Sequence, residues 1–168
     1  MAVTDTTIRF ARANDAQTIH NFIQGLAQYE REPEAVEATP ESIRAQLQSQ
    51  QPPFECLLAE VNGEARGFAL FFHNYSTWRG KQGIYLEDLY VPEQHRGVGI
   101  GELLLATLAR IAETRGCPRL EWQVLDWNQP SIDFYEALGT KVMGDWLPCR
   151  LENQELSELA AQGTTVEP

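Results

Sequence analysis

Two spacings of hydrophobic residues alternate along the chain, and they predict alternating strands and helices. Residues 7–11 read as a first short strand, and Asn14 is expected to cap a helix that carries a hydrophobic stripe and ends near Gln28. Thr39 and Pro40 are expected to begin a second helix as its cap and first position. The stretch between the two helices is acidic and interrupted by proline, which is typical of a loop.

Strand spacing dominates the middle of the chain. The segments FECLLAEV and ARGFALFFHNY, joined by the tight turn NGE, read as a hairpin, and GIYLEDLYV reads as the next strand. A helix over residues 100–115 follows, with Gly116 to stop it, and RLEWQVLDW reads as a further strand. Asn128 is then expected to begin a helix that ends at Gly139.

The last part of the chain completes the predicted order of elements. KVMGDWLPCRLE is expected to form one or two closing strands, and the polar tail from Asn153 is expected to be weakly helical. The order β-α-α-β-β-β-α-β-α-β predicts an α/β (α+β) fold around a central mixed sheet. The length of 168 residues suits a single domain, 1–168, with a core over about residues 6–152.

Charge and cysteine content narrow the classes of function. A net charge of −11 makes nucleic acid and anionic membranes poor partners and suits a small cationic substrate, although acidity alone also serves solubility. The three cysteines, Cys56, Cys117 and Cys149, lack the spacing of a disulfide framework or a zinc site, so we expect no metal. No long apolar run and no signal-like start is visible, and we expect a cytoplasmic protein.

A cluster of glycines lies between a predicted strand and the helix that starts near Ile100. Gly97, Gly99 and Gly101 would let successive N–H groups point into one concavity at the positive end of the helix, and Arg96 adds a cation beside them. Such a loop suits a phosphate group, although a plain glycine-rich turn has the same spacing. The spacing fits neither a nucleoside-triphosphate loop nor the dinucleotide fingerprint.

Two motifs in this order resemble a known superfamily. R-x-x-G-x-G after a strand ending LYV resembles the acyl-CoA pyrophosphate loop of the GNAT superfamily of N-acetyltransferases, and WNQPSIDFYEALG resembles its second CoA segment. The stretches LAQYERE, FECLLAEV and YSTWRGKQGIYLEDLYV are further similar to the spermidine/spermine N-acetyltransferase family, which includes a thialysine branch. This resemblance covers about residues 8–139.

The resemblance implies a cosubstrate and a set of residues that bind it. The fold would be the GNAT fold, with helices around the sheet, two splayed parallel strands at the CoA site, and a homodimer as the assembly. Acetyl-CoA would be the cosubstrate, with no metal. The residues implied to bind it are Leu89, Val91, Arg96, Gly97, Val98, Gly99, Ile100, Gly101, Asn128, Ser131 and Tyr135.

Two adjacent acids in an otherwise apolar strand are the candidates for proton transfer. Strand alternation would place Glu87 on one face, with Tyr85 and Leu89, and Asp88 on the other, with Leu86 and Tyr90. One acid would then face the buried side, unless the strand is bulged or borders a cavity. The resemblance implies that Glu87 is the general base, acting through water, and that Asp88 helps to bind a cationic substrate. In the alternative reading, one acid faces solvent and the other pairs with a nearby arginine or lysine.

Tyr135 is the candidate general acid. Asn128, Ser131 and Tyr135 would stack on one face of a helix and form a polar stripe toward CoA. The alternative is a core tyrosine that packs with Ile132 and Leu138. No arrangement of residues for a covalent acyl-enzyme is visible, so direct attack by an amine is preferred.

The resemblance also implies a channel for the amine. Tyr29, Glu30 and Trp78 match positions that line it, although Glu30 could be a solvated loop charge and Trp78 a packing residue. Ser76 stands where polyamine-specialised members carry an acid, and this is closer to the thialysine branch. The leading hypothesis is an acetyl-CoA-dependent N-acetyltransferase for a small di- or polyamine. The alternatives are a thialysine or lysine acetyltransferase, a protein N-acetyltransferase, or a non-catalytic CoA or polyamine sensor.

Overall fold

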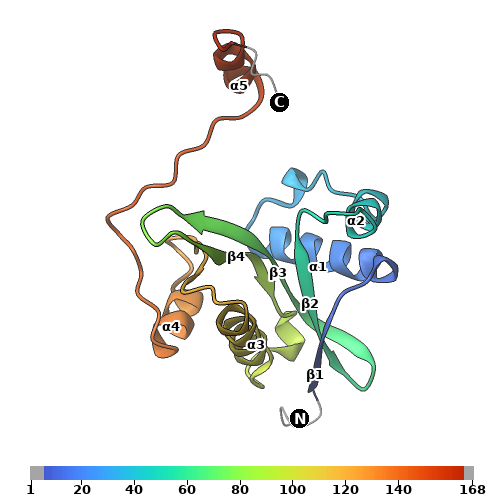
Figure 1. The fold of residues 1–168 in the computed structure, drawn as a ribbon. Helices are drawn as coiled ribbons and strands as arrows, with labels where there is room; N and C mark the ends of the chain where they lie inside the picture. Colours follow the sequence, from blue (N-terminus) through green and yellow to red (C-terminus); the bar gives the residue numbers. More distant parts are fainter. Residues whose placement is uncertain (1–5, 165–168) are drawn as a thin grey trace. The chain divides into compact units, whose positions relative to one another are not determined.

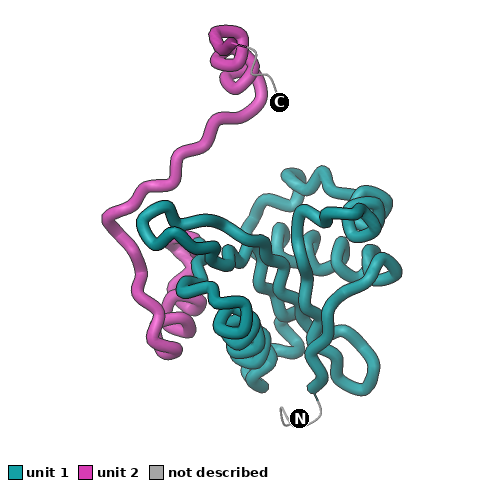
Figure 2. The backbone as a smooth tube through the Cα atoms, viewed as in Figure 1, with its two compact units in different colours: residues 1–123 teal, residues 124–168 magenta. Residues whose placement is uncertain are grey.

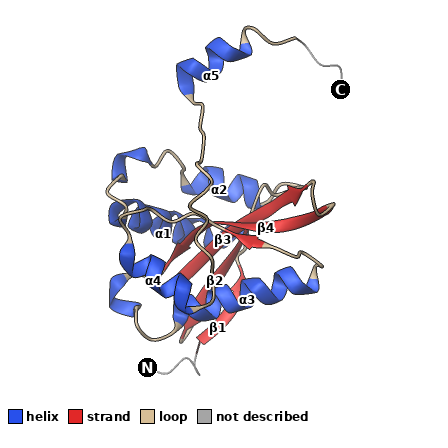
Figure 3. Ribbon diagram, turned by 90° about the vertical axis from the view of Figure 1, so that its left-hand side faces the viewer, coloured by secondary structure: helices blue, strands red, loops and turns tan. Residues whose placement is uncertain are grey.

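The chain divides into two compact units, residues 1–123 and residues 124–168 (Figure 2). The structure is a computed structural model and describes residues 6–164. The first unit contains a mixed sheet with helices on both of its faces, and Figures 1 and 3 show α1 and α2 on one face and α3 on the other. Over its described residues, the regular elements of the second unit are helices.

The sheet has five strands in the order β1-β2-β3-β4-β5. The first four strands are antiparallel, and β4 and β5 are parallel, which confirms the predicted mixed sheet. The turn between β2 and β3 is the predicted one, with Asn62 and Gly63 at φ 53° and 76°, the left-handed pair that a tight hairpin requires. The strands are β1 (Thr6–Phe10), β2 (Glu55–Val61), β3 (Glu64–Ser76), β4 (Lys81–Tyr90) and β5 (Leu120–Glu121).

The helices of the first unit follow the predicted order. They are η2 (Ala13–Asp15), α1 (Ala16–Tyr29), η3 (Pro33–Ala35), α2 (Pro40–Leu47), η4 (Glu93–His95) and α3 (Ile100–Thr114). Thr39 caps α2 as predicted and accepts the N–H of Ser42 at 3.1 Å. The prediction that Asn14 caps α1 is wrong. The Asp15 carboxylate accepts the Arg12 N–H at 2.7 Å and forms an ion pair with Arg9, so the chain first makes a turn of 3-10 helix.

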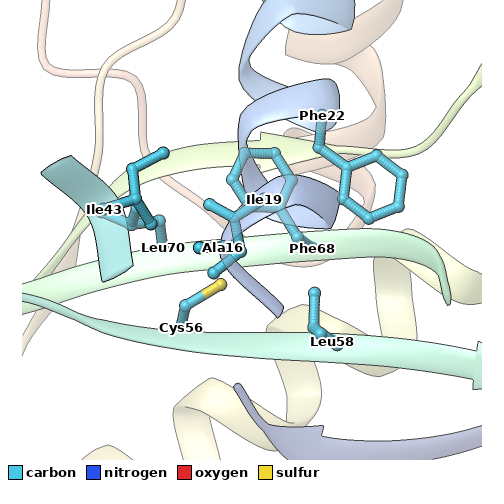
Figure 4. Close-up of a cluster of buried hydrophobic side chains, with 8 residues drawn as sticks. All are labelled: Ala16, Ile19, Phe22, Ile43, Cys56, Leu58, Phe68 and Leu70. Atoms are coloured by element: carbon cyan, nitrogen blue, oxygen red, sulfur yellow. The ribbon is translucent and has the colours of Figure 1, made fainter. Parts of the chain in front are cut away.

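The core between α1, α2 and the sheet fixes the position of α1. Eight buried side chains form it, and Figure 4 shows them between the helices and strands β2 and β3: Ala16, Ile19, Phe22, Ile43, Cys56, Leu58, Phe68 and Leu70. The rings of Phe22 and Phe68 stack with centroids 5.4 Å apart. Burying aromatic side chains of this size stabilises the packing of α1 on β3 by a few kcal/mol, on the order of 2 for each ring.

The second unit departs from the prediction after its first helix. Asn128 accepts the N–H of Ser131 and begins α4 (Gln129–Ala137), and Gly139 at φ 85° ends it, as predicted. The predicted closing strands are absent, because residues 141–152 have no regular structure and α5 (Asn153–Ala160) follows. A strand requires a neighbour for its hydrogen bonds, and the described residues of this unit offer none. Pro148 also lacks the N–H that a ladder needs.

Candidate active site

A β-bulge interrupts β4 at the pair of acids. Leu86 pairs with Phe71 and Asp88 pairs with Leu70, so Glu87 has no partner on β3. Directly opposed residues of an antiparallel pair point to the same face, and Leu70 and Phe71 are neighbours on opposite faces. The prediction that Leu86 and Asp88 share a face is therefore wrong. The physical reason is the extra residue, which turns the strand between them.

The bulge gives the two acids different surroundings. Glu87 is exposed, whereas Asp88 is partly buried on the face of Leu70, a member of the core beneath α1 and α2. Burial, together with the negative charges of Glu87 and Glu30, raises the pKa of Asp88 to about 7. Burial also raises the pKa of Glu30. The carboxylates of Glu87 and Glu30 thus lie close enough to act on that of Asp88 at this end of β4, and such a group of negative charges attracts a cation.

A close approach between α1 and β4 brings Glu30 to this place. A Cβ atom at Gly25 would lie 2.8 Å from the ring and hydroxyl of Tyr90, so only glycine lets Tyr90 lie against the helix in this position. Tyr90 also contacts Phe22, with ring centroids 6.3 Å apart. The last turn of α1, with Tyr29 and then Glu30 at its C-cap, is consequently held near the end of β4.

Arg96 contacts the aromatic rings at this end of the strand. Its guanidinium carbon lies 4.6 Å from the centroid of the Tyr29 ring and 5.7 Å from that of Tyr90. Its Nε donates a hydrogen bond of 2.7 Å to the carbonyl oxygen of Val91. Arg96 therefore lies against Tyr29. The family resemblance assigns Arg96 to cosubstrate binding and Tyr29 to amine binding.

The glycine loop has the backbone conformation that the sequence predicts. Gly97 and Gly99 adopt φ 74° and 88°, and Gly99 is the N-cap of α3 without any side-chain cap. The first N–H groups of this 15-residue helix are therefore not covered by a capping side chain. A Cβ atom at Gly97 would meet no atom within 4 Å, so the loop faces open space. Unpaired N–H groups at a helix start favour an anion.

The remaining loop residues have distinct environments. Val98 is exposed, whereas the side chain of Ile100 is buried and anchors α3 to the sheet. Gly101 lies in the first turn of α3. At Gly67 of β3, a Cβ atom would lie 3.0 Å from Val91 and 3.3 Å from Ile100, so β3 closely supports both ends of the loop.

The parallel strands separate beside the bulge. β4 pairs with β5 only at Ile84 and Tyr85, and the following residues of β4, which include Leu89, have no β5 partner. The predicted strand RLEWQVLDW is accordingly shortened to Leu120–Glu121. An outer edge of β4 that lacks a neighbouring strand leaves backbone groups for an extended ligand arm.

Trp78 lies far from the other predicted residues of the amine channel within this unit. It is 92% exposed in the turn after β3, and Leu70, the partner of Asp88, lies about 20 Å from the strand end at Ser76, at about 3.3 Å per residue. The Ser76 hydroxyl accepts the N–H of Arg79 at 3.3 Å and holds that turn. The structure does not bring Trp78 to the carboxylates.

The remaining predicted residues belong to the second unit. Asn128 and Ser131 form the cap of α4, and the ring of Tyr135 lies 5.3 Å from that of Phe134, between centroids. Tyr135 is partly exposed, and Leu138, a partner in the alternative core reading, is 43% exposed.

Sequence reasoning missed two residues that shape this site. Tyr90 supplies the second ring beside Arg96, and Gly25 makes room for it. A glycine in the interior of a helix is unfavourable by about 1 kcal/mol, and that cost was a signal of a close approach. The two adjacent acids, Glu87 and Asp88, had left a bulge open as one alternative.

Comparison with known proteins identifies the class to which this fold and loop belong. Residues 19–140 match the model of the acetyltransferase (GNAT) family, and the chain belongs to that family. It is therefore an acyltransferase. A protein of the mobile metagenome of V. cholerae, an integron cassette protein, has the same fold, with a TM-score of 0.78 at 24% identity over 93% of this chain and 98% of that one.

Two curated relatives confirm the narrower resemblance. The chain is 37% identical to the thialysine N-epsilon-acetyltransferase of Bos taurus, over 92% of this chain and 97% of the relative. It is 35% identical to the spermidine/spermine N(1)-acetyltransferase-like protein 1 of Homo sapiens, over 91% of this chain and 23% of that longer protein.

No helix among residues 6–164 is long and apolar enough to cross a membrane. Within the same residues, no group of three or more His, Cys, Asp or Glu side chains is arranged to hold a metal ion.

Proposed function

We propose that this acetyltransferase acts on a primary amine of a small cationic molecule, either a di- or polyamine or a lysine-like amino acid such as thialysine. The observation that supports this most strongly is the group of carboxylates at the bulge of β4, where the negative charges of Glu87 and Glu30 help to raise the pKa of Asp88. Tyr29 and Tyr90 add aromatic faces beside them, already in contact with one cation. The names of both curated relatives refer to cationic amines.

We propose that acetyl-CoA is held by the glycine loop and by the open edge of β4. The N–H groups of residues 97–101 and the uncapped start of α3 would bind its pyrophosphate, and Leu89 and Val91 would pair with its extended arm. Asn128, Ser131 and Tyr135 are the proposed contacts from the second unit. Bound acetyl-CoA supplies a thioester whose C–S bond is replaced by the C–N bond of the amide, while the released thiolate takes up a proton.

The task of the carboxylates is to bind the ammonium group and to remove one proton from it. A primary ammonium has a pKa of about 10.4, so nearly all of it is protonated at neutral pH and cannot attack. We propose that Glu87, exposed at the bulge, accepts this proton through water, as the resemblance implies. Asp88 and Glu30 then hold the cation. Asp88 is partly protonated at pH 7 in the free protein, and a cation beside it would favour its ionised form.

The proton donor to the leaving thiolate is proposed to be Tyr135, and the Leu89 N–H is proposed to hold the developing oxyanion. Replacing Tyr135 by phenylalanine tests the donor, because it removes one oxygen and keeps the ring. Turnover should fall at least tenfold, with coenzyme A affinity, measured by titration calorimetry, within twofold of the wild type. Unchanged turnover would remove Tyr135 from the mechanism.

The experiment that tests the proposed function is thiol release from acetyl-CoA with a panel of amines. The panel contains putrescine, spermidine, spermine, lysine, thialysine and a lysine-containing peptide. Turnover with a small amine supports the proposal, and the ranking chooses between the polyamine and thialysine substrates. Turnover with the peptide alone contradicts it and favours a protein acetyltransferase. If no amine of the panel causes thiol release although coenzyme A still binds, the proposal is contradicted and a sensor is favoured.

Three further expectations follow, of which only the homodimer rests on the family resemblance. We propose that two copies form a homodimer, that both units belong to one acetyltransferase domain, and that the protein is cytoplasmic, without nucleic acid or membrane as a partner. Sedimentation velocity tests the first of these. A single species at the monomer mass, 19.0 kDa, across micromolar concentrations would contradict it.

A further inference from the structure

The side chain of Arg96 makes contacts that the two substrates would need. Its Nε donates to the carbonyl oxygen of Val91 at 2.7 Å, and that oxygen lies in the stretch proposed to pair with the arm of acetyl-CoA. Its guanidinium also stacks at 4.6 Å on Tyr29, next to Glu30, where the ammonium group of the amine is proposed to bind. The Arg96 side chain therefore contacts one group of each proposed site, the Val91 oxygen of the cosubstrate site and the Tyr29 ring of the amine site.

The contacts of Arg96 mark the aromatic pair as a place for a cation. Tyr29 and Tyr90 come from α1 and β4, and the guanidinium is near the faces of both rings. Cations commonly bind over the faces of aromatic rings in proteins. The protein's own cation fills this place in the structure.

The position of Arg96 in the chain couples it to the glycine loop. It directly precedes Gly97, whose φ of 74° and open surroundings leave the backbone free of side-chain obstruction. An anion bound by the N–H groups of residues 97–101 would lie beside this residue and attract its guanidinium. The arm of acetyl-CoA would compete for the Val91 oxygen at the same time. Both effects move Arg96 away from the rings.

We propose that Arg96 is a positioning residue that couples the two binding sites: it covers the aromatic cation site until the cosubstrate binds, and its displacement then opens that site to the amine. The inference rests on the proposed function, since it takes the loop as the pyrophosphate site and the rings as part of the amine site. By linkage, each ligand then raises the affinity for the other by the same factor.

The test is the affinity of an amine with and without coenzyme A, which lacks the acetyl group and so allows no turnover. Spermidine and thialysine are the probes, titrated by calorimetry. In the wild type, saturating coenzyme A should strengthen amine binding at least tenfold. In Arg96→Met, which keeps the length of the side chain but loses its charge, this ratio should fall below threefold, because the amine binds more tightly without coenzyme A. A wild-type ratio near one, or an unchanged ratio in Arg96→Met, would overturn the proposal.

Arg66→Met is the matched control. Arg66 also lies next to the loop, where its Nη1 is 3.0 Å from the Nε2 of His95, and it pairs with Glu64, but it has no aromatic partner among the described residues. This variant removes one positive charge near the loop and should keep the tenfold ratio. If Arg66→Met lowers the ratio as much as Arg96→Met, general electrostatics explains the effect and the proposal is wrong.

A second measurement is independent of the amine. The Arg96 Nε–H signal in a ¹⁵N spectrum, assigned by its absence in Arg96→Met, should exchange slowly with water in the free protein, because it is bonded to Val91. Adding coenzyme A should shift this signal and speed its exchange. An unmoved signal at saturation would overturn the proposal. If the amine panel is silent but the signal moves, the proposed function has failed while the displacement of Arg96 stands.

Discussion

The two parts of the candidate site in residues 1–123 use different chemistry. The glycine loop offers main-chain N–H groups, and its geometry depends on φ values of 74° and 88° at Gly97 and Gly99. The end of β4 offers carboxylates, and its chemistry depends on burial, which raises the pKa of Asp88 to about 7. The first part is set by local backbone conformation and the second by tertiary packing. Substitutions should therefore act through geometry at the loop and through charge and pH at the bulge.

The largest expected effect is at the bulge. Glu87→Gln removes the proposed proton acceptor and keeps its shape, so turnover should fall about 10²–10⁴-fold, the range for general acid–base catalysis. Steady-state thiol release with the best amine of the panel measures this. Glu93→Gln, an exposed carboxylate in η4, is the matched control and should keep turnover within twofold. Loss of less than tenfold in Glu87→Gln would assign proton transfer elsewhere.

Asp88→Asn should change stability in a pH-dependent way. The pKa of Asp88 is near 4 in the unfolded chain and about 7 in the folded one, so the folded protein holds the extra proton between these values. Its contribution therefore weakens folding as pH rises from 4 to 7, by up to about 4 kcal/mol at about 1.4 per pKa unit. Asp88→Asn should raise the free energy of unfolding at pH 8 and leave it unchanged near pH 4. Urea unfolding at both pH values tests this, and an equal effect at both would refute the raised pKa.

The same substitution should remove a pH dependence of binding. In the wild type, amine affinity should rise between pH 6 and pH 8, because ionised Asp88 attracts the ammonium and the ionised fraction grows through a pKa of about 7. In Asp88→Asn, affinity should be lower and nearly flat over this range. Titration calorimetry of spermidine with coenzyme A present measures both curves. A parallel rise in the variant would assign the pH dependence to another group.

The contrast also explains how far the sequence could predict the site. The glycine loop was predictable because a positive φ and a helix start are local properties of a few residues. The faces of Leu86 and Asp88 were not predicted by alternation, because a bulge depends on how β4 pairs with β3; the two adjacent acids made a bulge one alternative but could not decide it. The prediction of closing strands was wrong for a related reason. Their apolar residues are typical of a strand, but a strand forms only where a neighbour supplies hydrogen bonds.

The smallest expected effect is at the loop, and it should be purely geometric. Gly97→Ala places a Cβ on a residue with φ 74°, which costs about 1–2 kcal/mol in the left-handed region, so the loop would relax away from the N–H arrangement. The KM for acetyl-CoA should rise about tenfold, with no change in the pH dependence of turnover. Gly63→Ala is the matched control, because Gly63 has φ 76° and equally open surroundings but lies in the β2–β3 turn. It should lose similar stability while its KM stays within twofold. Equal KM values in the two variants would show that the backbone of the loop does not hold the cosubstrate, and the difference between the two parts of the site would then disappear.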